Sequence, residues 1–269
     1  MNQRIRPALE GVPETMLYTL RDRVYEATRR GGRLHDPDAV RIYHQLDVDF
    51  RRFGPPTGAF GLRAAGFDEI ARAFVATTGD PVVISLGEGL ETQRYRVDGD
   101  RLWVSVDLPV AMDVRERFMA PDDAHWHVRD SATAPGLFDG LPAGRPTLVL
   151  AQGLLMYLPP HEVKALVVRL AERRPGARLA FDVLPRWLTS VSQVGLPLST
   201  RYRLPRMPFG LDRGEAARVL SSWVPGATTH EHPLPFAWSV PRLLYGAARR
   251  LPLLAPRVPS IVVVDLPRR

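Results

Sequence analysis

The chain has 269 residues, of which 45% are hydrophobic, enough for one α/β domain with its own core. It contains no cysteine, which excludes disulfides and thiolate metal sites. The formal net charge is +7, but Lys164 is the only lysine and the arginines are scattered singly or in pairs. Because no basic run is interleaved with aromatic residues, we expect no nucleic-acid partner.

The N-terminal stretch MNQRIRPALEG lacks the apolar core of a signal peptide. No apolar run approaches the roughly 18 residues that a membrane span requires. We therefore expect a cytoplasmic protein without a membrane partner. The sequence gives no indication of the oligomeric state.

The first 60 residues predict a helical cap. Residues 14–27 have apolar side chains at helical spacing on one face. A second helix is expected after Asp36 as N-cap, with Pro37 at the first helical position. The glycines and prolines of residues 54–61 interrupt this pattern, and a further amphipathic helix is expected over 67–79.

From Val82 onward, expected strands alternate with helices. The clearest helix covers residues 162–174, and Asp212 with Glu215 forms the pattern of a capping box at the start of another. This alternation predicts an α/β fold with a doubly wound, mostly parallel sheet, whose ligands bind beyond the carboxyl ends of the strands. The seven expected strands are 82–86, 102–106, 125–129, 147–151, 177–183, 227–232 and 260–264.

The organisation that we expect is a single domain over residues 1–269. Residues 1–60 would form the helical cap and residues 61–269 the α/β core. The proline-rich segment 185–211 is too long for a simple connection. Long loops of this kind are often lids or substrate walls, so we expect a lid-like insertion there.

Two glycines, Gly87 and Gly89, follow the first strand in the stretch VVISLGEGLETQ. A dinucleotide fingerprint requires a third glycine where this sequence has Thr92, which disfavours a nicotinamide-dependent oxidoreductase. Glu88 and Glu91 would also repel a phosphate, by about 4 kcal/mol at ~4 Å and an effective dielectric constant near 20. S-adenosylmethionine, which has no phosphate and has a cationic end, suits this turn better.

Acidic residues also follow the next two expected strands. Asp107 comes about twenty residues after the glycine turn, where a carboxylate can accept hydrogen bonds from both ribose hydroxyls. Asp130 follows the third strand, where a carboxylate can accept from the adenine amino group. The alternative for each is a cap or turn residue. Their occurrence in register, strand after strand, favours the cofactor interpretation.

Two long stretches of the sequence are informative together: VVISLGEGLETQRYRVDGDRLWVSVDLPVAMDVRERF and LVLAQGLLMYLPPHEVKALVVRLAERRPGARLAFD. They resemble the leucine carboxyl methyltransferase family, and most closely its bacterial branch of polyketide O-methyltransferases. The similarity covers roughly residues 15–185. The resemblance implies a class I methyltransferase fold, a Rossmann-like sheet of seven strands with the last strand antiparallel. It also implies S-adenosyl-L-methionine as the cofactor.

The resemblance implies a set of cofactor contacts along the chain. Arg63 is expected near the methionine carboxylate, Gly87 in the turn, Asp107 at the ribose, and Asp130 with Ser131 near the adenine. Gly89, the second glycine of the turn, is also expected to contact the cofactor. The family usually has glutamate at the position of Gln152, in the motif QGLLMYL. We hypothesise that Glu88 replaces this missing charge and faces the ammonium group of the cofactor.

The function that we expect is an S-adenosylmethionine-dependent O-methyltransferase acting on a small-molecule carboxylate or phenol in polyketide-type metabolism. No general base is evident, which favours a carboxylate, because that group is already ionised at neutral pH. The alternative is a catalytically weak, S-adenosylmethionine-binding accessory or regulatory protein. No metal site is expected, and Tyr157 is expected to pack in the core more than to line a substrate pocket.

Overall fold

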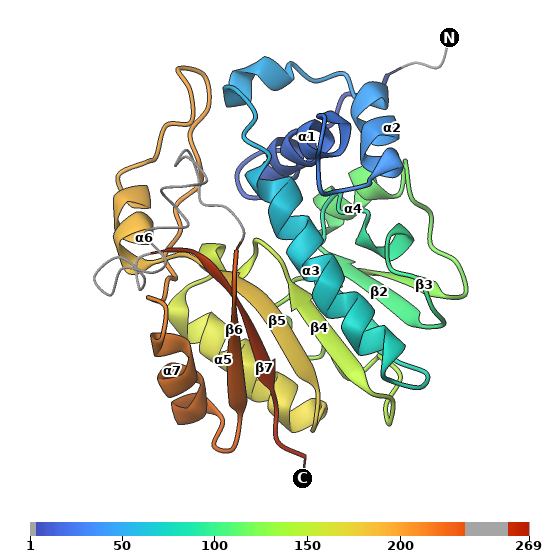
Figure 1. Ribbon diagram of the computed structural model, residues 1–269, viewed down its shortest axis with the longest axis vertical. Coiled ribbons are helices and arrows are strands. Elements are labelled where there is room, and N and C mark those ends of the chain that lie inside the picture. The colour runs from blue at the N-terminus through green and yellow to red at the C-terminus, as the bar shows by residue number, and fades with distance from the viewer. Residues whose placement is uncertain (1–3, 235–257, 269) are drawn as a thin grey trace.

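The computed structural model describes residues 4–234 and 258–268. A twisted seven-stranded sheet runs through the molecule, with helices on both of its faces (Figure 1). The strands lie in the order β3-β2-β1-β4-β5-β7-β6. Their bounds are β1 Val82–Leu86, β2 Leu102–Asp107, β3 His125–Arg129, β4 Thr147–Ala151, β5 Arg178–Val183, β6 Thr228–Pro233 and β7 Ser260–Asp265.

The pairing of the strands confirms the expected class I methyltransferase sheet. Strands β3, β2, β1, β4 and β5 pair in parallel, whereas β7 runs antiparallel to both β5 and β6. All seven strands match the predicted bounds within one residue at each end. The match is close because short apolar segments bounded by turn residues are the clearest local signal of buried strands.

Alternate residues of the strands face two separate apolar cores. Val82 and Ile84 of β1 pack in the core that contains α5 (Pro160–Arg173) and α7 (Glu215–Trp223). Val83, between them, packs with α3 (Ala59–Ala76) on the other face. Because both faces are covered, the strands are apolar throughout rather than alternating with polar residues.

The N-terminal helices α1 (Thr15–Thr28) and α2 (Pro37–Gln45) lie beyond the carboxyl end of β1 (Figure 1). Asp36 is the N-cap of α2, as expected, and its Oδ1 atom accepts a hydrogen bond from the Ala39 N–H at 2.9 Å. A short 3-10 turn, η1 (Phe50–Phe53), follows α2. These elements share a third apolar core with residues of the insertion at 185–211.

Two predicted helix starts are corrected by the structure. Helix α3 begins at Ala59, inside the segment 54–61 that we expected to be irregular, because Gly58 has a φ of 79° and allows the chain to turn into the helix. Helix α7 has Gly214 as its N-cap. Half of the expected capping box forms, because the Glu215 carboxylate accepts from the Asp212 N–H at 3.1 Å, but the Asp212 carboxylate accepts from the Arg186 N–H at 3.0 Å. Across the described parts of the chain, no helix has both the length and the apolar character for crossing a membrane.

The insertion at 185–211 contains helix α6 (Arg186–Ser192) and then runs back over the N-terminal elements. The Phe53 and Tyr202 rings lie edge to face, with centroids 4.6 Å apart. Arg201 and Asp49 form an ion pair at 3.0 Å. The remaining short elements are η2 (Gln93–Tyr95), α4 (Pro109–Arg115) and η3 (Leu155–Tyr157).

Candidate active site

A cavity of about 250 Å³ lies at the carboxyl ends of β1, β2 and β4. The turn after β1 forms one wall, and residues of α1 and of the segment preceding it form another. This is the position at which ligands bind in open α/β sheets. Of the residues expected to contact the cofactor, all except Asp130 line this cavity.

The two turn glycines border the cavity with their backbone. Gly87 and Gly89 have φ angles of 62° and 54°, in the left-handed region that glycine adopts without strain. A Cβ atom at Gly87 would lie 2.8 Å from Leu154 Cδ1, and one at Gly89 would lie 2.9 Å from Met16 Cβ. The turn therefore requires glycine at both positions, for backbone conformation and for space.

Asp107 ends β2 and is hydrogen-bonded to the glycine turn. Its Oδ2 atom accepts from the Gly89 N–H at 2.6 Å, and its Oδ1 atom accepts from the Leu108 N–H at 2.8 Å. Burial raises the pKa of this carboxyl group, while the two backbone donors oppose that effect. Each oxygen retains capacity for a further hydrogen bond, so this group suits a ligand with hydroxyl donors.

The two residues expected near the adenine have different environments. Ser131 lines the cavity, whereas Asp130 is exposed and lies outside it. The Asp130 Oδ1 atom accepts from the Ser131 N–H at 2.7 Å. In this arrangement the Asp130 carboxylate orders the turn that presents Ser131.

Arg63 reaches the cavity from α3 and is buried. Its Nη1 atom donates to Asp182 Oδ2 at 3.0 Å, and the other oxygen of Asp182 accepts from the Gly153 N–H at 2.5 Å. The ion pair fixes the guanidinium at the cavity wall. Arg63 is thus a fixed cation that suits an anionic ligand group.

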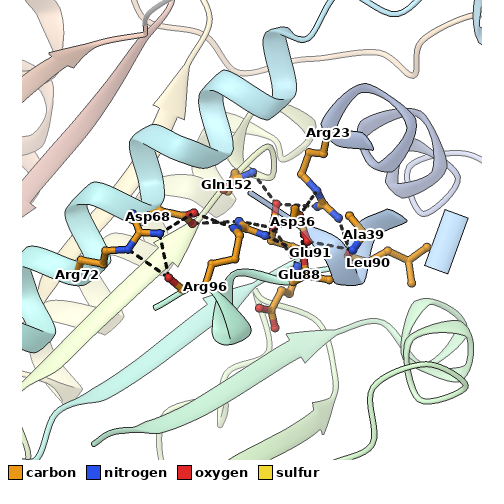
Figure 2. Close-up of polar contacts among 12 residues, drawn as sticks. Arg23, Asp36, Ala39, Asp68, Arg72, Glu88, Leu90, Glu91, Arg96 and Gln152 are labelled. Atoms are coloured by element: carbon orange, nitrogen blue, oxygen red, sulfur yellow. Dashed lines mark hydrogen bonds and ion pairs between the residues drawn. The ribbon is translucent and has the colours of Figure 1, made fainter. Parts of the chain in front are cut away.

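The orientation that we expected for Glu88 is wrong. Its side chain is fully buried beneath the turn, where Oε1 accepts from Trp103 Nε1 at 3.0 Å and Oε2 lies 3.2 Å from Arg115 Nη2. Burial raises the pKa of the Glu88 carboxyl group, and the Arg115 guanidinium opposes the effect. Figure 2 shows the Glu88 side chain directed away from Glu91 and Gln152. The carboxylate therefore cannot face a ligand in the cavity.

The carboxylate beside Gln152 belongs to Glu91, from the same turn (Figure 2). Glu91 Oε2 accepts from Gln152 Nε2 at 3.1 Å and from Arg23 Nη1 at 2.7 Å, and Oε1 accepts from Arg96 Nη2 at 2.8 Å. Burial alone would raise the pKa of Glu91, but the Arg23 and Arg96 guanidiniums lower it to about 2. Glu91 is therefore ionised at neutral pH.

Arg96 and Arg23 together extend these contacts to three helices. It donates to Asp68 of α3 at 2.7 Å and 3.0 Å, and to Asp36 at the start of α2 at 2.7 Å. Arg23 contributes from α1 and lies 3.5 Å from Asp36. We call Arg23, Asp36, Asp68, Glu91 and Arg96 the buried ion cluster. Sequence reasoning missed this cluster because its members are up to 73 positions apart, from residue 23 to residue 96.

A smaller pocket, of about 40 Å³, adjoins the main cavity. Thr15, Thr19, Arg63, Gly153 and Tyr157 line both. The smaller pocket is otherwise mostly apolar, with walls that include Tyr18, Phe60, Met156, Leu184 and Leu204. Tyr157, which we expected to serve mainly in core packing, also lies at the junction between the two cavities. Burial raises the pKa of its hydroxyl to about 12.

Comparison with known proteins agrees with this geometry. The model of the leucine carboxyl methyltransferase family matches residues 47–171. Tetracenomycin polyketide synthesis O-methyltransferase TcmP of Streptomyces glaucescens is 31% identical over 236 residues, which cover 86% of this chain and 85% of that protein. The chain belongs to the leucine carboxyl methyltransferase family. The similarity to TcmP also confirms the expected polyketide branch of the family.

Two further similarities agree with a methyltransferase and with its fold. A candidate S-adenosyl-L-methionine-dependent methyltransferase of Streptomyces coelicolor is 27% identical over 155 residues, covering 53% of this chain and 50% of that protein. Among solved structures, a candidate methyltransferase of Thermobifida fusca superimposes with a TM-score of 0.54 at 14% identity, covering 96% of this chain and 95% of that chain. The structural match supports the fold alone.

This chain is thus an S-adenosyl-L-methionine-dependent methyltransferase with a class I fold. The cavity fits that cofactor in its chemistry. Asp107 offers acceptors for hydroxyl groups, and Arg63 is a fixed cation. The Oε1 atom of Gln152 is buried and has no hydrogen-bond partner among the residues that the structure describes. It is an acceptor available to a cationic ligand group.

Proposed function

We propose that this methyltransferase transfers the methyl group to an oxygen of a small-molecule carboxylate or phenol, with a carboxylate favoured. The reacting end of the acceptor would enter the smaller, mostly apolar pocket, next to the cofactor cavity. The observation that carries the proposal is the meeting of the two cavities at Arg63, Gly153 and Tyr157. The name of TcmP supports O-methylation and polyketide metabolism as the setting.

We assign the parts of the cofactor to residues of the main cavity. Asp107 would accept hydrogen bonds from the ribose hydroxyls, and Ser131, presented by Asp130, would contact the adenine. Arg63 would pair with the methionine carboxylate, and the Gln152 amide oxygen with the ammonium. Gly87 and Gly89 would let the backbone approach the cofactor closely, in line with the lack of space for a Cβ atom at either residue. Glu88 would not contact the cofactor and would only support the turn from beneath.

The bound cofactor supplies an electrophilic methyl group on a sulfonium. The residues of the chain position the acceptor and exclude water. Tyr157 and Tyr18 both have a raised pKa through burial, so both hydroxyls are protonated at neutral pH. Asp182 is paired with Arg63 and the Gly153 N–H. The described lining of the smaller pocket therefore offers no free base, which favours an acceptor that is already ionised.

The segments around the smaller pocket would exclude solvent from the acceptor. Tyr18 comes from the N-terminal helices, and Leu204 comes from the insertion at 185–211. Both are buried, and they belong to one apolar core. We propose that residues 1–60 are a cap and residues 185–211 a lid on a single-domain enzyme whose α/β core begins near residue 61.

Methyl transfer to matched acceptors tests the proposal. The protein would be incubated with S-adenosylmethionine and aromatic compounds that bear a carboxylate, a phenol or an amine on the same ring system. We expect a mass increase of one methylene on the carboxylate, in a product that mild alkali cleaves as an ester. A methyl ether that is stable to alkali would instead show that the acceptor is a phenol oxygen. Methylation of the amine alone would contradict O-methyl transfer.

A further inference from the structure

A series of three side chains connects the N-terminal helix α1 to the cofactor cavity. Arg23 on α1 donates to Glu91 Oε2 at 2.7 Å, and the same oxygen accepts from Gln152 Nε2 at 3.1 Å. Arg23 is 2% exposed and Glu91 6% exposed, so water does not weaken these contacts. All three residues line the cavity. Figure 2 shows them joined in this order.

The charge of Glu91 determines how the Gln152 amide is oriented. An ionised carboxylate has no proton to donate, so only the NH2 end of an amide can face it. Glu91 is ionised, because the nearby arginines lower its pKa to about 2. The amide oxygen, Oε1, must therefore point away from Glu91. This oxygen is buried without a partner among the residues in the described part of the chain.

We propose that Arg23 and Glu91 are positioning residues for the cofactor. Together they orient the Gln152 amide so that its oxygen accepts a hydrogen bond from the ammonium group of the methionine end. Arg23 keeps Glu91 ionised and in place, and Glu91 fixes the amide. The inference rests on the placement of the methionine end at Gln152 in the proposed function, and is independent of the acceptor.

The same contacts favour a neutral amide over a carboxylate at position 152. A carboxylate at position 152 would bring a second negative charge to the site of the Nε2 atom, 3.1 Å from Glu91 Oε2. Two unit charges at such a distance repel strongly in a buried site. A neutral amide avoids this repulsion and still offers an oxygen to the cofactor. Gln152 is therefore compatible with a functional cofactor site.

The position of Arg23 makes the N-terminal helix part of the cofactor site. Met16, about two turns earlier on the same face of α1, also contacts the glycine turn, since its Cβ atom is 2.9 Å from the position of a Cβ at Gly89. Arg23 Nη2 further donates to the Leu90 carbonyl oxygen at 2.6 Å. Helix α1 thus holds both the backbone of the turn and the side chain that orients Gln152.

Two ligands that differ at the methionine end test the inference by calorimetry, with no acceptor present. S-adenosylhomocysteine carries the amino group, whereas methylthioadenosine lacks the amino-acid end. We expect Gln152→Leu to weaken S-adenosylhomocysteine binding at least tenfold and to leave methylthioadenosine binding unchanged. Arg23→Met should reduce the affinity ratio of the two ligands threefold to tenfold. The double variant should show no further loss in the ratio beyond Gln152→Leu.

The control is Arg21→Met, on the same helix. Arg21 is also buried, but it donates to the Phe50 and Gly54 carbonyl oxygens, away from Glu91. It should lower the melting temperature and leave the ligand ratio unchanged. If Arg23→Met does not fold, Glu91→Gln replaces it with the same expected fall in the ratio. An equal loss for both ligands, or an unchanged ratio in both variants, would overturn the inference. A failure to methylate any carboxylate or phenol would not affect it.

Discussion

The Gly89 N–H donates to Asp107 Oδ2 at 2.6 Å, which joins the turn after β1 to the end of β2. Gly89 follows β1 and Asp107 ends β2, and these two strands pair in parallel, so their carboxyl ends meet at one edge of the sheet. Asp107 therefore has two functions in one carboxylate. It fixes the backbone of the glycine turn, and it retains acceptor capacity toward the cavity.

Asp107→Asn should weaken S-adenosylhomocysteine binding at least tenfold. The amide NH2 group cannot accept from the Gly89 N–H or from a hydroxyl, and hydrogen bonds to charged groups contribute about 1.5–3 kcal/mol each. Calorimetry on the purified variant measures the change. Asp98→Asn, at an exposed position before β2, is the control and should bind as the unmodified protein does. Equal cofactor affinities in the two variants would show that Asp107 stabilises the turn and does not bind the cofactor.

Gly87→Ala should impair cofactor binding by about tenfold or more. The added Cβ would lie 2.8 Å from Leu154 Cδ1, in a backbone conformation with a φ of 62°. Either the Leu154 side chain or the turn must then shift, and the positive φ strains an alanine in both cases. Gly79→Ala is the matched control, because no heavy atom lies within 4 Å of a Cβ there and no positive φ is required. Thermal-shift titration with S-adenosylhomocysteine distinguishes the two. Unchanged binding by Gly87→Ala would show that the turn tolerates a side chain.

Glu88→Gln should lower the free energy of unfolding and have little effect on cofactor affinity. The substitution leaves the buried Arg115 without its charged partner, and breaking a buried pair costs about 3–5 kcal/mol when no other group compensates. Arg115 keeps its hydrogen bonds to the Gly89 and Glu91 carbonyl oxygens, so the loss should lie at or below that range. Urea denaturation gives the stability, and calorimetry at low denaturant gives the affinity. A large loss of affinity with unchanged stability would show that the Glu88 side chain contacts the cofactor.

The stability of the protein should fall as the pH is lowered from 6.5. His125 is buried, and its Nε2 atom lies 2.7 Å from Ser105 Oγ. Burial and the nearby Arg115 lower the pKa of His125 to about 2 in the folded state. Between pH 6.5 and 2 the unfolded chain therefore binds a proton that the folded protein does not. The stability that neutral His125 contributes is thus fully present above pH 6.5 and is lost progressively below it.

One such group changes the free energy of unfolding by about 1.4 kcal/mol per pH unit, or about 2 kcal/mol between pH 6.5 and 5. His125→Asn should remove this dependence of the unfolding free energy on pH. Urea denaturation at pH 6.5 and at pH 5 measures it. His161→Asn, at an exposed position, should keep it. If the unfolding free energy changes equally with pH in the unmodified protein and in both variants, His125 takes up its proton in the folded state as well.

The sheet could be predicted from the sequence because its signals are local. Each strand is a short apolar segment between turn residues, and two glycines directly follow β1. The antiparallel direction of the last strand came from the resemblance to a family, and the structure confirms it for β7. The cofactor was also inferred correctly, but the argument from charge in the turn assumed that both carboxylates face the ligand.

Only the tertiary structure decided between Glu88 and Glu91. The two residues are three positions apart in one turn, and nothing in the sequence distinguishes their directions. Their partners lie elsewhere: Trp103 is 15 positions from Glu88, and Arg23 is 68 positions from Glu91. A buried carboxylate is stable only where such partners compensate for its lost hydration, so the packing of α1 and β2 around the turn determines which carboxylate reaches the cavity.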